Sequence, residues 1–331
     1  MLENAALLYK AFGDPLEQLQ LCQKDKAPLQ ADEVLVKMLV SPINPSDLIP
    51  ISGAYSHRIK LPATAGYEGV GIVIDTGADV SQDMIGKRVV PVRGEGTWQQ
   101  YVTVKAKYAI EVPPVISDHD ACRLYINPLT AWLICKETLD IQPNDLLLMN
   151  GGGTSIALIF AQLSRVLGFR LIAIARNEGS AKQLQAFGAW KVIDASKGHV
   201  TEMIADACSG KGADYAIDAV GGADSEILAG GLKPNGMLVS YGLLSGIPAD
   251  WKKLHETYHL SPKLFALRLW NEHHTAEAYR RRFSEVIDLF AKGDLTMNAP
   301  AAVFRFERYK EALRCNELAK GKILLDFSSS S

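Results

Sequence analysis

The sequence lacks a charge excess of either sign, because its 331 residues contain 35 Lys+Arg and 37 Asp+Glu, for a formal net charge of −2. Proteins that bind nucleic acids or anionic membrane surfaces usually carry a large field of one sign. We therefore expect a small-molecule partner, with no nucleic acid and no membrane. Cysteine is also scarce, and its five residues are scattered without a C-x-x-C pair. This pattern argues against a disulfide framework or a thiolate metal cluster and favours a reducing compartment.

Long apolar runs are absent as well, since no stretch approaches the roughly 18 residues that a membrane span requires. The first residues, MLENAALLYKAFGDP, do not combine a basic segment with a long apolar one, so no secretion signal is predicted. We expect a soluble, cytoplasmic protein. Its length exceeds the roughly 250 to 300 residues at which a single core usually stops growing, which predicts two domains.

Up to about residue 120 the sequence contains β-branched runs interrupted by proline and glycine. Three of them are EVLVKMLVSPINPSD (33–47), AGYEGVGIVIDTG (65–77) and GKRVVPVRGEGTWQQYVTV (86–104). Short strands separated by turns are typical of a compact, β-rich, barrel-like domain.

From residue 144 onward, strands are predicted to alternate with helices. Residues 145–149 form an apolar run, and apolar residues then recur with helical spacing from Ile156 to Leu167, before Gly168 at the position of a C-terminal cap. Five more strands are expected at RLIAIA (170–175), WKVIDA (190–195), ADYAIDAV (213–220), GMLVSYG (236–242) and LFALRLW (264–270). The alternation predicts an α/β fold with a doubly wound parallel sheet, and six strands match its dinucleotide-binding version.

After Trp270 the sequence predicts one more helix and a last strand, KILLDF (322–327). The apolar face of the helix carries Tyr279, Phe283, Val286, Ile287 and Phe290. We assign residues 1–123 and 271–331 to a substrate domain and residues 124–270 to a cofactor-binding domain. The site is expected in the cleft between them, at the carboxyl ends of the parallel strands.

The turn after the first parallel strand is rich in glycine but departs from the G-x-G-x-x-G fingerprint, because no third glycine follows. Glycine permits a tight turn and a close backbone approach to a pyrophosphate, and a helix N-terminus attracts anions. The small Ala157 can replace the third glycine at the helix–strand contact. The residues predicted to bind a dinucleotide here are Gly151, Gly152, Gly153, Thr154 and Ser155, with Thr154 or Ser155 capping the helix. The alternative is a tight strand-to-helix turn without a ligand.

The end of the next strand indicates which dinucleotide is bound. An NAD site usually places Asp or Glu about 20 residues after the glycine turn, whereas an NADP site needs a cation for the 2′-phosphate. RLIAIA runs directly into Arg176 and Asn177, and Glu178 lies farther from the strand end. We therefore predict NADPH, held by Arg176 and Asn177. A solvated loop arginine is the alternative.

The order of SPINPSD, AGYEGVG, GTWQQYV, YINPLTAW, the glycine turn and YGLLSG resembles the medium-chain dehydrogenase/reductase superfamily over essentially the whole chain. Within it, GTW, NPLTAW and the asparagine before the glycine turn are most similar to the 2-enoyl thioester reductases, followed by the NADPH:quinone oxidoreductases. The resemblance implies a Rossmann domain and a β-rich, GroES-like domain with a partly open barrel. It also implies a homodimer, for which the strand at 264–270 is a candidate edge.

The zinc-dependent alcohol dehydrogenases of this superfamily carry Cys where this sequence has Asn44, and G-H-E where it has Gly66-Tyr67-Glu68. Both ligand positions are lost, and the lobe with four closely spaced cysteines is missing. No metal is therefore predicted. The seven histidines are interpreted as ordinary residues, including the pair His273-His274 at an expected helix entry.

The resemblance then implies NADPH-dependent hydride transfer without zinc to a conjugated C=C, most directly that of a trans-2-enoyl thioester of coenzyme A or acyl carrier protein. Tyr55 matches the catalytic tyrosine of the enoyl thioester reductases by its spacing before LPATAGYEG, with a packing role as the alternative. Asn44 is predicted to hold the substrate or the cofactor amide, and Thr130 and Gly242 to contact the cofactor. Reduction of quinones is the second hypothesis, and a non-catalytic NADPH-binding protein is the third.

Two other groups of residues are weighed and given no catalytic role. Trp98 and Trp270 are candidate walls of an acyl pocket, although aromatic residues at such places usually belong to the core. The run Arg280-Arg281-Arg282 either meets the phosphates of a carrier arm or forms the solvated side of its helix, and the second interpretation is favoured.

Overall fold

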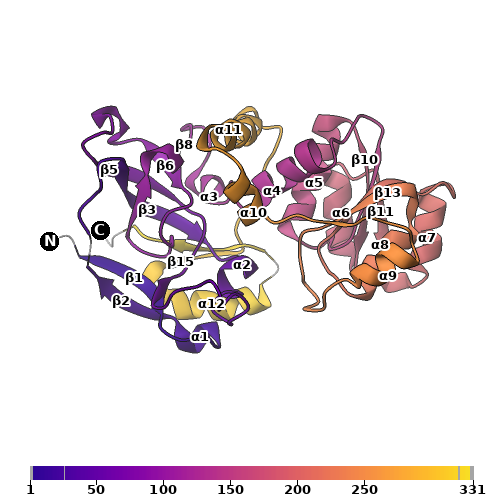
Figure 1. The fold of residues 1–331 in the computed structure, drawn as a ribbon, viewed down its shortest axis with the longest axis horizontal. Coiled ribbons are helices and arrows are strands. Elements are labelled where there is room, and N and C mark those ends of the chain that lie inside the picture. The colour runs from indigo at the N-terminus through magenta and orange to yellow at the C-terminus, as the bar shows by residue number, and fades with distance from the viewer. Residues whose placement is uncertain (1–2, 26, 320, 329–331) are drawn as a thin grey trace. The chain divides into compact units, whose positions relative to one another are not determined.

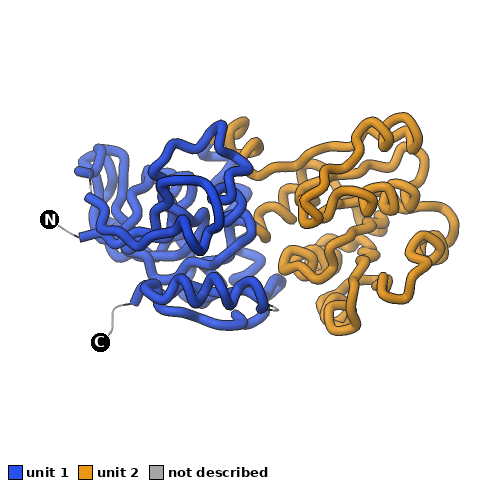
Figure 2. Tube along the Cα trace, turned by 90° about the horizontal axis from the view of Figure 1, so that it is seen from below, with its two compact units in different colours: residues 1–126, 276–331 blue, residues 127–275 orange. Residues whose placement is uncertain are grey.

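The computed structural model describes residues 3–25, 27–319 and 321–328. The chain divides into two compact units (Figure 1). Unit 1 contains residues 1–126 and 276–331, and unit 2 contains residues 127–275, drawn in blue and orange in Figure 2. The chain therefore leaves unit 1 once and returns to it.

Unit 1 is built on two sheets. A three-stranded antiparallel sheet has the order β2 (Gln20–Lys24), β1 (Asn4–Tyr9), β4 (Ala63–Thr64). The larger sheet has the order β15 (Ala302–Arg305), β16 (Ile323–Asp326), β3 (Glu33–Pro42), β5 (Val70–Thr76), β6 (Arg88–Pro91), β8 (Ala109–Glu111), and β7 (Tyr101–Lys105) pairs with β3. β3 is antiparallel to three strands, β5, β7 and β16, so it ties the sheet to the C-terminal part of the chain. The predicted β-rich domain is confirmed.

The helices of unit 1 are mostly short. They are α1 (Pro15–Gln18), α2 (Pro45–Leu48), α3 (Asp118–Ala121), α11 (Ala276–Lys292) and α12 (Tyr309–Leu318), with single 3₁₀ turns η1 (Gln82–Met84), η2 (Ala106–Tyr108) and η5 (Phe306–Arg308). The five predicted apolar residues of α11 are the ones that it buries. Trp98, fully buried, lies in the core with side chains from β1, β3 and α12. Trp98 is thus a core residue, as aromatic residues at such places usually are.

Unit 2 holds a six-stranded sheet in which every pairing is parallel. Its order is β11 (Lys191–Asp194), β10 (Arg170–Ala175), β9 (Leu146–Met149), β12 (Ala213–Asp218), β13 (Leu232–Ser240), β14 (Lys263–Leu264). The direction of winding reverses between β9 and β12, which is the arrangement of the dinucleotide-binding fold. The predicted doubly wound sheet is confirmed.

Helices accompany the strands of unit 2, as Figure 1 shows. They are α4 (Asn127–Leu133), which continues into the π-helical turn η3 (Ile134–Thr138), α5 (Ser155–Leu167), α6 (Glu178–Phe187), α7 (Val200–Ala207), α8 (Ala223–Gly230), α9 (Trp251–Glu256) and α10 (Leu267–His273), with the 3₁₀ turn η4 (Ala195–Lys197) after β11. α5 begins after the predicted cap Thr154 and ends at Gly168, which is left-handed. Both termini could be predicted from the sequence. A threonine side chain accepts from a free N–H at the N-terminus, and a glycine adopts the left-handed conformation that ends the helix. Among the described helices, none is both long and apolar enough to cross a bilayer.

The prediction of a strand at 264–270 is wrong. Only Lys263 and Leu264 form β14, and the chain enters α10 at Leu267. A short apolar run fits a strand and a buried helix equally well. Here the helical spacing brings the rings of Trp270 and His274 into a stack with centroids 4.2 Å apart. His273 is the last residue of α10 and His274 is its C-cap, and the expected next helix, α11, begins two residues later at Ala276.

The C-terminal region contains two elements that the sequence interpretation missed, the strand β15 and the helix α12. α12 buries Tyr309, Ala312 and Leu313. This i, i+3, i+4 spacing is a helical signal, but it covers only one turn and a half and is easily overlooked. β15 is a short edge strand that pairs in parallel with β16. Its four residues carry too little pattern for the strand to be predicted from the sequence.

Candidate active site

The glycine turn of unit 2 packs so closely against its neighbours that two of its three glycines leave no room for a side chain. Gly151 has φ +66°, and a Cβ at this position would lie 2.9 Å from the Cβ of Ala219. A Cβ on Gly152 would lie 2.6 Å from the carbonyl oxygen of Ile174. Neither position accepts a side chain without a shift of its neighbours, whereas Gly153 meets only the Ser180 hydroxyl at 3.4 Å. The first two glycines are required by the turn itself, and the third leaves the approach to the helix unobstructed.

Helix α5 starts directly after this turn. The Thr154 hydroxyl donates to the carbonyl oxygen of Gly151 at 2.8 Å and accepts from the N–H of Ala157 at 3.4 Å. Thr154 is therefore the cap, and Ser155 is the first helical residue. The free N–H groups of the first turn and the helix dipole favour an anion at this end.

A buried hydrogen-bond network fixes the point at which the winding of the sheet reverses. Asn150 donates through Nδ2 to Asp218 Oδ1 at 2.7 Å and accepts from the N–H of Ala219 at 2.7 Å. Asp218 is fully buried, and its carboxylate also accepts from Val220 N, Gly221 N and the Ser225 hydroxyl. The ends of β9 and β12 are thereby locked together. The sequence analysis used Asn150 only as part of a family resemblance, and it did not single out Asp218. A carboxylate within an apolar strand indicates a buried polar site, because an ionised group is buried only where hydrogen bonds compensate it.

Gly242 lies beside the same loop. A Cβ at Gly242 would approach the carbonyl oxygen of Ala219 to 2.7 Å, and Leu244 N donates to that oxygen at 3.0 Å. The segment after β13 is thus held against the segment after β12. Gly151 and Gly242 both face Ala219, so two of the predicted cofactor residues meet at one place.

The end of β10 presents a free cation. Arg176 is exposed and, among the residues that the structure describes, its guanidinium has no hydrogen-bond or ion-pair partner. Asn177 caps α6 by accepting from Ser180 N at 2.9 Å. Glu178 pairs with Lys182 at 2.8 Å on the surface of α6. Thr130, in contrast, is 92% buried within α4, past the start of that helix.

Unit 1 contains a buried polar cluster of Asn44, Asp47, Glu68 and Lys322. Asn44 donates through Nδ2 to Glu68 Oε1 at 2.9 Å and accepts from Lys322 Nζ at 2.6 Å. The Asp47 carboxylate accepts from Asn44 N at 2.8 Å and from Tyr67 N at 2.9 Å. Glu68 Oε2 accepts from Ile126 N at 2.8 Å. The cluster therefore links α2, the segment before β5, the residue just before β16, and Ile126, the last residue before the chain enters unit 2.

Burial changes the acidity of all three ionisable members of this cluster. It raises the pKa of Asp47 to about 7 against the opposing effect of the two N–H donors. It also raises the pKa of Glu68 and lowers that of Lys322, because a buried charge of either sign loses its hydration. The charge of Glu68 disfavours that of Asp47, and Lys322 favours the charges of both carboxylates.

Unit 1 also carries two exposed tyrosines, and the backbone N–H of one of them, Tyr67, donates to the cluster at Asp47. Tyr55 lies in the turn-rich segment 51–58, is 37% exposed, and has the Arg58 guanidinium 4.0 Å from its ring centroid. Tyr67 is 46% exposed. Within the described chain, neither hydroxyl has a hydrogen-bond partner. Both phenols are thus free to donate to a ligand.

Two family models and several curated relatives match this chain. Residues 30–114 match the model of the alcohol dehydrogenase GroES-like domain, and residues 155–292 match that of the zinc-binding dehydrogenases. The human mitochondrial enoyl-acyl-carrier-protein reductase is 30% identical over 317 residues, which cover 94% of this chain and 85% of the relative. The chain belongs to the medium-chain dehydrogenase/reductase superfamily.

Solved structures of this superfamily agree with the fold. A protein of Bacillus thuringiensis assigned as an NADPH:quinone reductase is 44% identical, with a TM-score of 0.97 over 99% of this chain and 100% of that one. The mitochondrial 2-enoyl thioester reductase Etr1p/Etr2p heterodimer of Candida tropicalis is 25% identical, with a TM-score of 0.85 over 99% and 100% of the two chains. Both branches suggested by the sequence motifs are therefore represented among the relatives.

Asn44 and Tyr67, which the sequence resemblance matched to zinc-ligand positions, are an amide and a phenol. Asn44 is engaged on both sides by Glu68 and Lys322, so its amide belongs to a protein network. Among the residues that the structure describes, no group of three or more His, Cys, Asp and Glu side chains is arranged to hold a metal ion.

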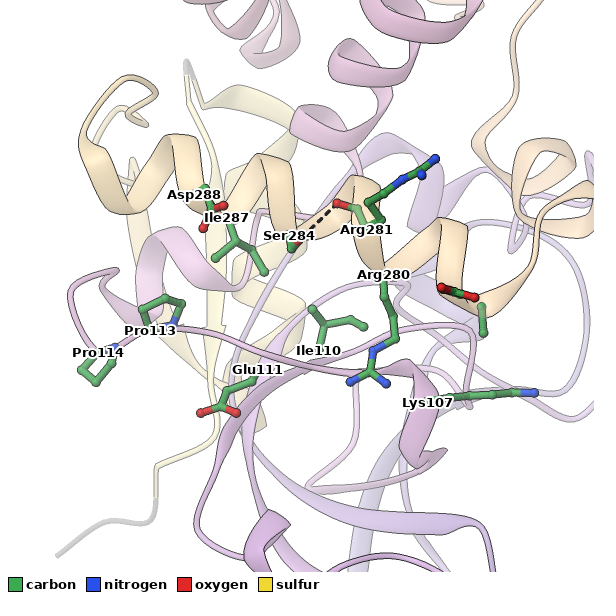
Figure 3. Close-up of a pocket in the computed structure, with 12 residues that line it drawn as sticks. Lys107, Ile110, Glu111, Pro113, Pro114, Arg280, Arg281, Ser284, Ile287 and Asp288 are labelled. Atoms are coloured by element: carbon green, nitrogen blue, oxygen red, sulfur yellow. Dashed lines mark hydrogen bonds between the residues drawn. The ribbon is translucent and has the colours of Figure 1, made fainter.

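The basic run of α11 separates into different environments. Arg282 pairs with Glu285 at 3.1 Å. Arg280 and Arg281 border an open hollow of about 880 Å³ between α11 and the segment 107–114. Figure 3 shows Arg280 extending from the helix toward Ile110, whereas Arg281 points away. Because acidic side chains, Glu111, Glu277 and Asp288, line the same hollow, this surface is no dedicated phosphate site.

Proposed function

We propose that the protein is an NADPH-dependent reductase that transfers hydride to the conjugated C=C of a trans-2-enoyl thioester. The observation that carries the proposal is the presence of two exposed phenols without a hydrogen-bond partner in the described chain, Tyr55 and Tyr67, the second of which is anchored to the buried cluster through Asp47. A phenol can donate to an enolate oxygen or carbon without a Lewis acid. The enoyl reductases among the relatives support this substrate class.

Unit 2 is proposed to bind the cofactor. Its residues fit a dinucleotide, because Gly151 and Gly152 keep the backbone bare and Thr154 and Ser155 begin an anion-attracting helix. Gly153, Gly242 and Thr130 complete the set proposed from the sequence. When bound, NADPH supplies the hydride. Arg176 is proposed to bind the 2′-phosphate, and Asn177 to orient this loop by capping α6.

Unit 1 is proposed to bind the substrate. Tyr55 is the proposed proton donor, since its hydroxyl is exposed and unpaired in the described chain. Asn44 is only 2% exposed, so we propose that it acts by holding Glu68 and Lys322 in place, with its second Nδ2–H available to a substrate or cofactor amide. A proton donor positioned in this way typically contributes roughly 10²- to 10⁴-fold to the rate.

Reduction of quinones is the second candidate, and one specific observation favours it. The Bacillus thuringiensis structure assigned to this activity has the higher sequence identity of the two solved relatives described above. A third candidate, an NADPH-binding protein without turnover, follows from the general fact that fold does not fix activity.

Steady-state NADPH oxidation separates the three candidates. Purified protein is offered trans-2-enoyl thioesters of increasing length, as coenzyme A and acyl-carrier-protein conjugates, beside several quinones. Higher kcat/KM for an enoyl thioester than for every quinone supports the proposal. The reverse order supports the quinone reductase, and tight NADPH binding without turnover of any electrophile supports the non-catalytic candidate.

We further propose a cytoplasmic homodimer. All five cysteines are free, which suits a reducing compartment. The edge-strand pairing expected of residues 264–270 is withdrawn, because most of that segment is helical. The two-residue β14 remains at the edge of the sheet, and Leu264 is 63% exposed there. Light scattering coupled to size-exclusion chromatography tests the dimer.

A further inference from the structure

Tyr67 combines an exposed side chain with a backbone that is held on every side. Gly66, which precedes it, has φ +89°, and a Cβ there would lie 2.4 Å from Trp98 Cδ1. Thr97 N donates to the carbonyl oxygen of Gly66 at 3.1 Å, and the Thr97 hydroxyl donates to that of Glu68 at 2.8 Å. The N–H of Tyr67 itself donates to the buried Asp47. The phenol is therefore presented from a fixed point.

The side chain held by this backbone is only partly used in packing. Tyr67 is 46% exposed, whereas the nearby Trp98 and Tyr9 are buried and already fill the core of unit 1. Binding sites are built from groups whose positions are fixed by the surrounding structure, and the anchored, partly exposed Tyr67 fits this requirement.

The surroundings of Tyr67 suit a neutral hydrogen-bond donor. Burial raises its pKa to about 12, with smaller contributions from Tyr9, Asp47 and Tyr55, while Arg58 acts in the opposite direction. The hydroxyl thus keeps its proton at every pH at which the enzyme is assayed. It has no acceptor in the described chain, so the proton is available to a ligand.

We propose that the Tyr67 hydroxyl donates a hydrogen bond to the substrate carbonyl oxygen and stabilises the enolate formed there. This assignment rests on the proposed enoyl thioester reductase function. Hydride from NADPH forms a bond to the β carbon, the C=C pair moves to the bond between the α carbon and the carbonyl carbon, and the carbonyl pair moves to oxygen. Tyr55 then protonates the α carbon, leaving NADP⁺ and the saturated thioester.

The two tyrosines have separate tasks in this scheme. Tyr67 keeps its proton and acts on the oxygen, as a donor in an oxyanion hole does. Tyr55 gives up its proton and recovers it from solvent. Tyr67 occupies the position of a zinc ligand in metal-dependent relatives, so the oxygen of the electrophile meets a phenol where it would otherwise meet the metal.

The first experiment compares Tyr67→Phe with the parent protein, both loaded with NADPH. The variant keeps the ring and removes one hydroxyl. NADPH affinity and Tm are expected to stay unchanged, and kcat for a trans-2-enoyl thioester is expected to fall roughly 10²-fold, the usual effect of losing one oxyanion donor. Tyr101→Phe, a half-buried phenol on β7, serves as the matched control and keeps full activity.

The second experiment needs no turnover. Acetoacetyl-CoA has an enolate that absorbs in the near ultraviolet, and it is titrated into protein loaded with NADP⁺. The parent and Tyr101→Phe are expected to raise the bound enolate fraction at a fixed pH. In Tyr67→Phe the pH at which half of the bound ligand is enolate shifts upward by about one unit, equivalent to a tenfold loss.

The outcomes separate this proposal from the proposed function. Turnover of enoyl thioesters by the parent, with equal kcat and equal enolate fraction in Tyr67→Phe, overturns the assignment of Tyr67 and leaves the function intact. Absence of enoyl thioester turnover by the parent overturns both. A loss of kcat with no change in the enolate titration also overturns it, because the hydroxyl would then act elsewhere than on the oxygen.

Discussion

The buried carboxyl of Asp47 predicts that stability falls as the pH rises from weakly acidic to neutral. Its pKa is about 7 in the fold and 3.8 as an ordinary aspartate. Between these values the folded protein binds a proton that the unfolded chain has released. The contribution of Asp47 is therefore fully present below about pH 4 and is lost as the pH rises through about 7.

The size of this effect follows from the shift. Each pKa unit corresponds to about 1.4 kcal/mol, so the carboxyl costs on the order of 4 kcal/mol of unfolding free energy between pH 4 and pH 8. The shift already includes the attraction of Lys322 and the repulsion of Glu68.

The assay compares urea unfolding of the parent with that of Asp47→Asn at pH 4.5, 5.5, 6.5 and 7.5. The amide cannot ionise, but it also loses one acceptor for a buried N–H, which costs about 1 to 3 kcal/mol at acidic pH. The variant should be less stable than the parent at pH 4.5, and the difference should shrink or reverse by pH 7.5. Asp75→Asn, on the exposed side of β5, is the control. A parent-minus-variant difference that is constant across this range refutes the reasoning.

Three further predictions concern the proposed site. Tyr55→Phe should retain NADPH affinity and lose roughly 10²- to 10⁴-fold in enoyl thioester turnover, with a much smaller effect on quinones; unchanged thioester rates would make Tyr55 a packing residue. Arg176→Ala should narrow a preference for NADPH over NADH that is at least about tenfold in the parent, and equal kcat/KM for both cofactors in the parent contradicts the phosphate contact. Elemental analysis should find no stoichiometric zinc and chelator should leave activity intact, because Asn44 and Tyr67 offer no good zinc donor; one zinc per chain, removed together with activity, disproves this.

Local signals in the sequence were sufficient for the cofactor half of the fold. The cap Thr154, the apolar stripe of α5 and the terminal Gly168 lie within 15 residues of one another, and each reports a local backbone requirement. The alternation of strand and helix then implied a doubly wound parallel sheet of the dinucleotide-binding type. The strand predicted at 264–270 was wrong because its apolar residues fit both the strand period of two and the helical period of about 3.6. In the structure the helix α10 buries Trp270.

The polar clusters could not be predicted in the same way, because they bring together residues that are far apart in the sequence. Lys322 is 278 residues away from Asn44 in the sequence, and Asp218 is 68 residues away from Asn150. No periodicity connects such residues, and a single sequence carries no covariation. A buried charge is a costly feature that only the assembled sheet makes tolerable.

The cluster around Lys322 also explains why the reactive groups should be phenols. The ammonium donates to the Asn44 amide oxygen and lies close to the carbonyl of Ile43, so it serves acceptors of the protein. A zinc ion at a comparable place would keep an open coordination position for a substrate oxygen. Two of the three N–H donors of Lys322 are engaged and burial lowers its pKa, so it is a poor substitute for such an ion. In the proposed function, electrophilic assistance comes instead from groups that reach solvent, and the exposed hydroxyls of Tyr55 and Tyr67 meet that requirement. The cluster thus acts as scaffold: Asp47 fixes the Tyr67 backbone, and the site's chemistry is left to its exposed rim.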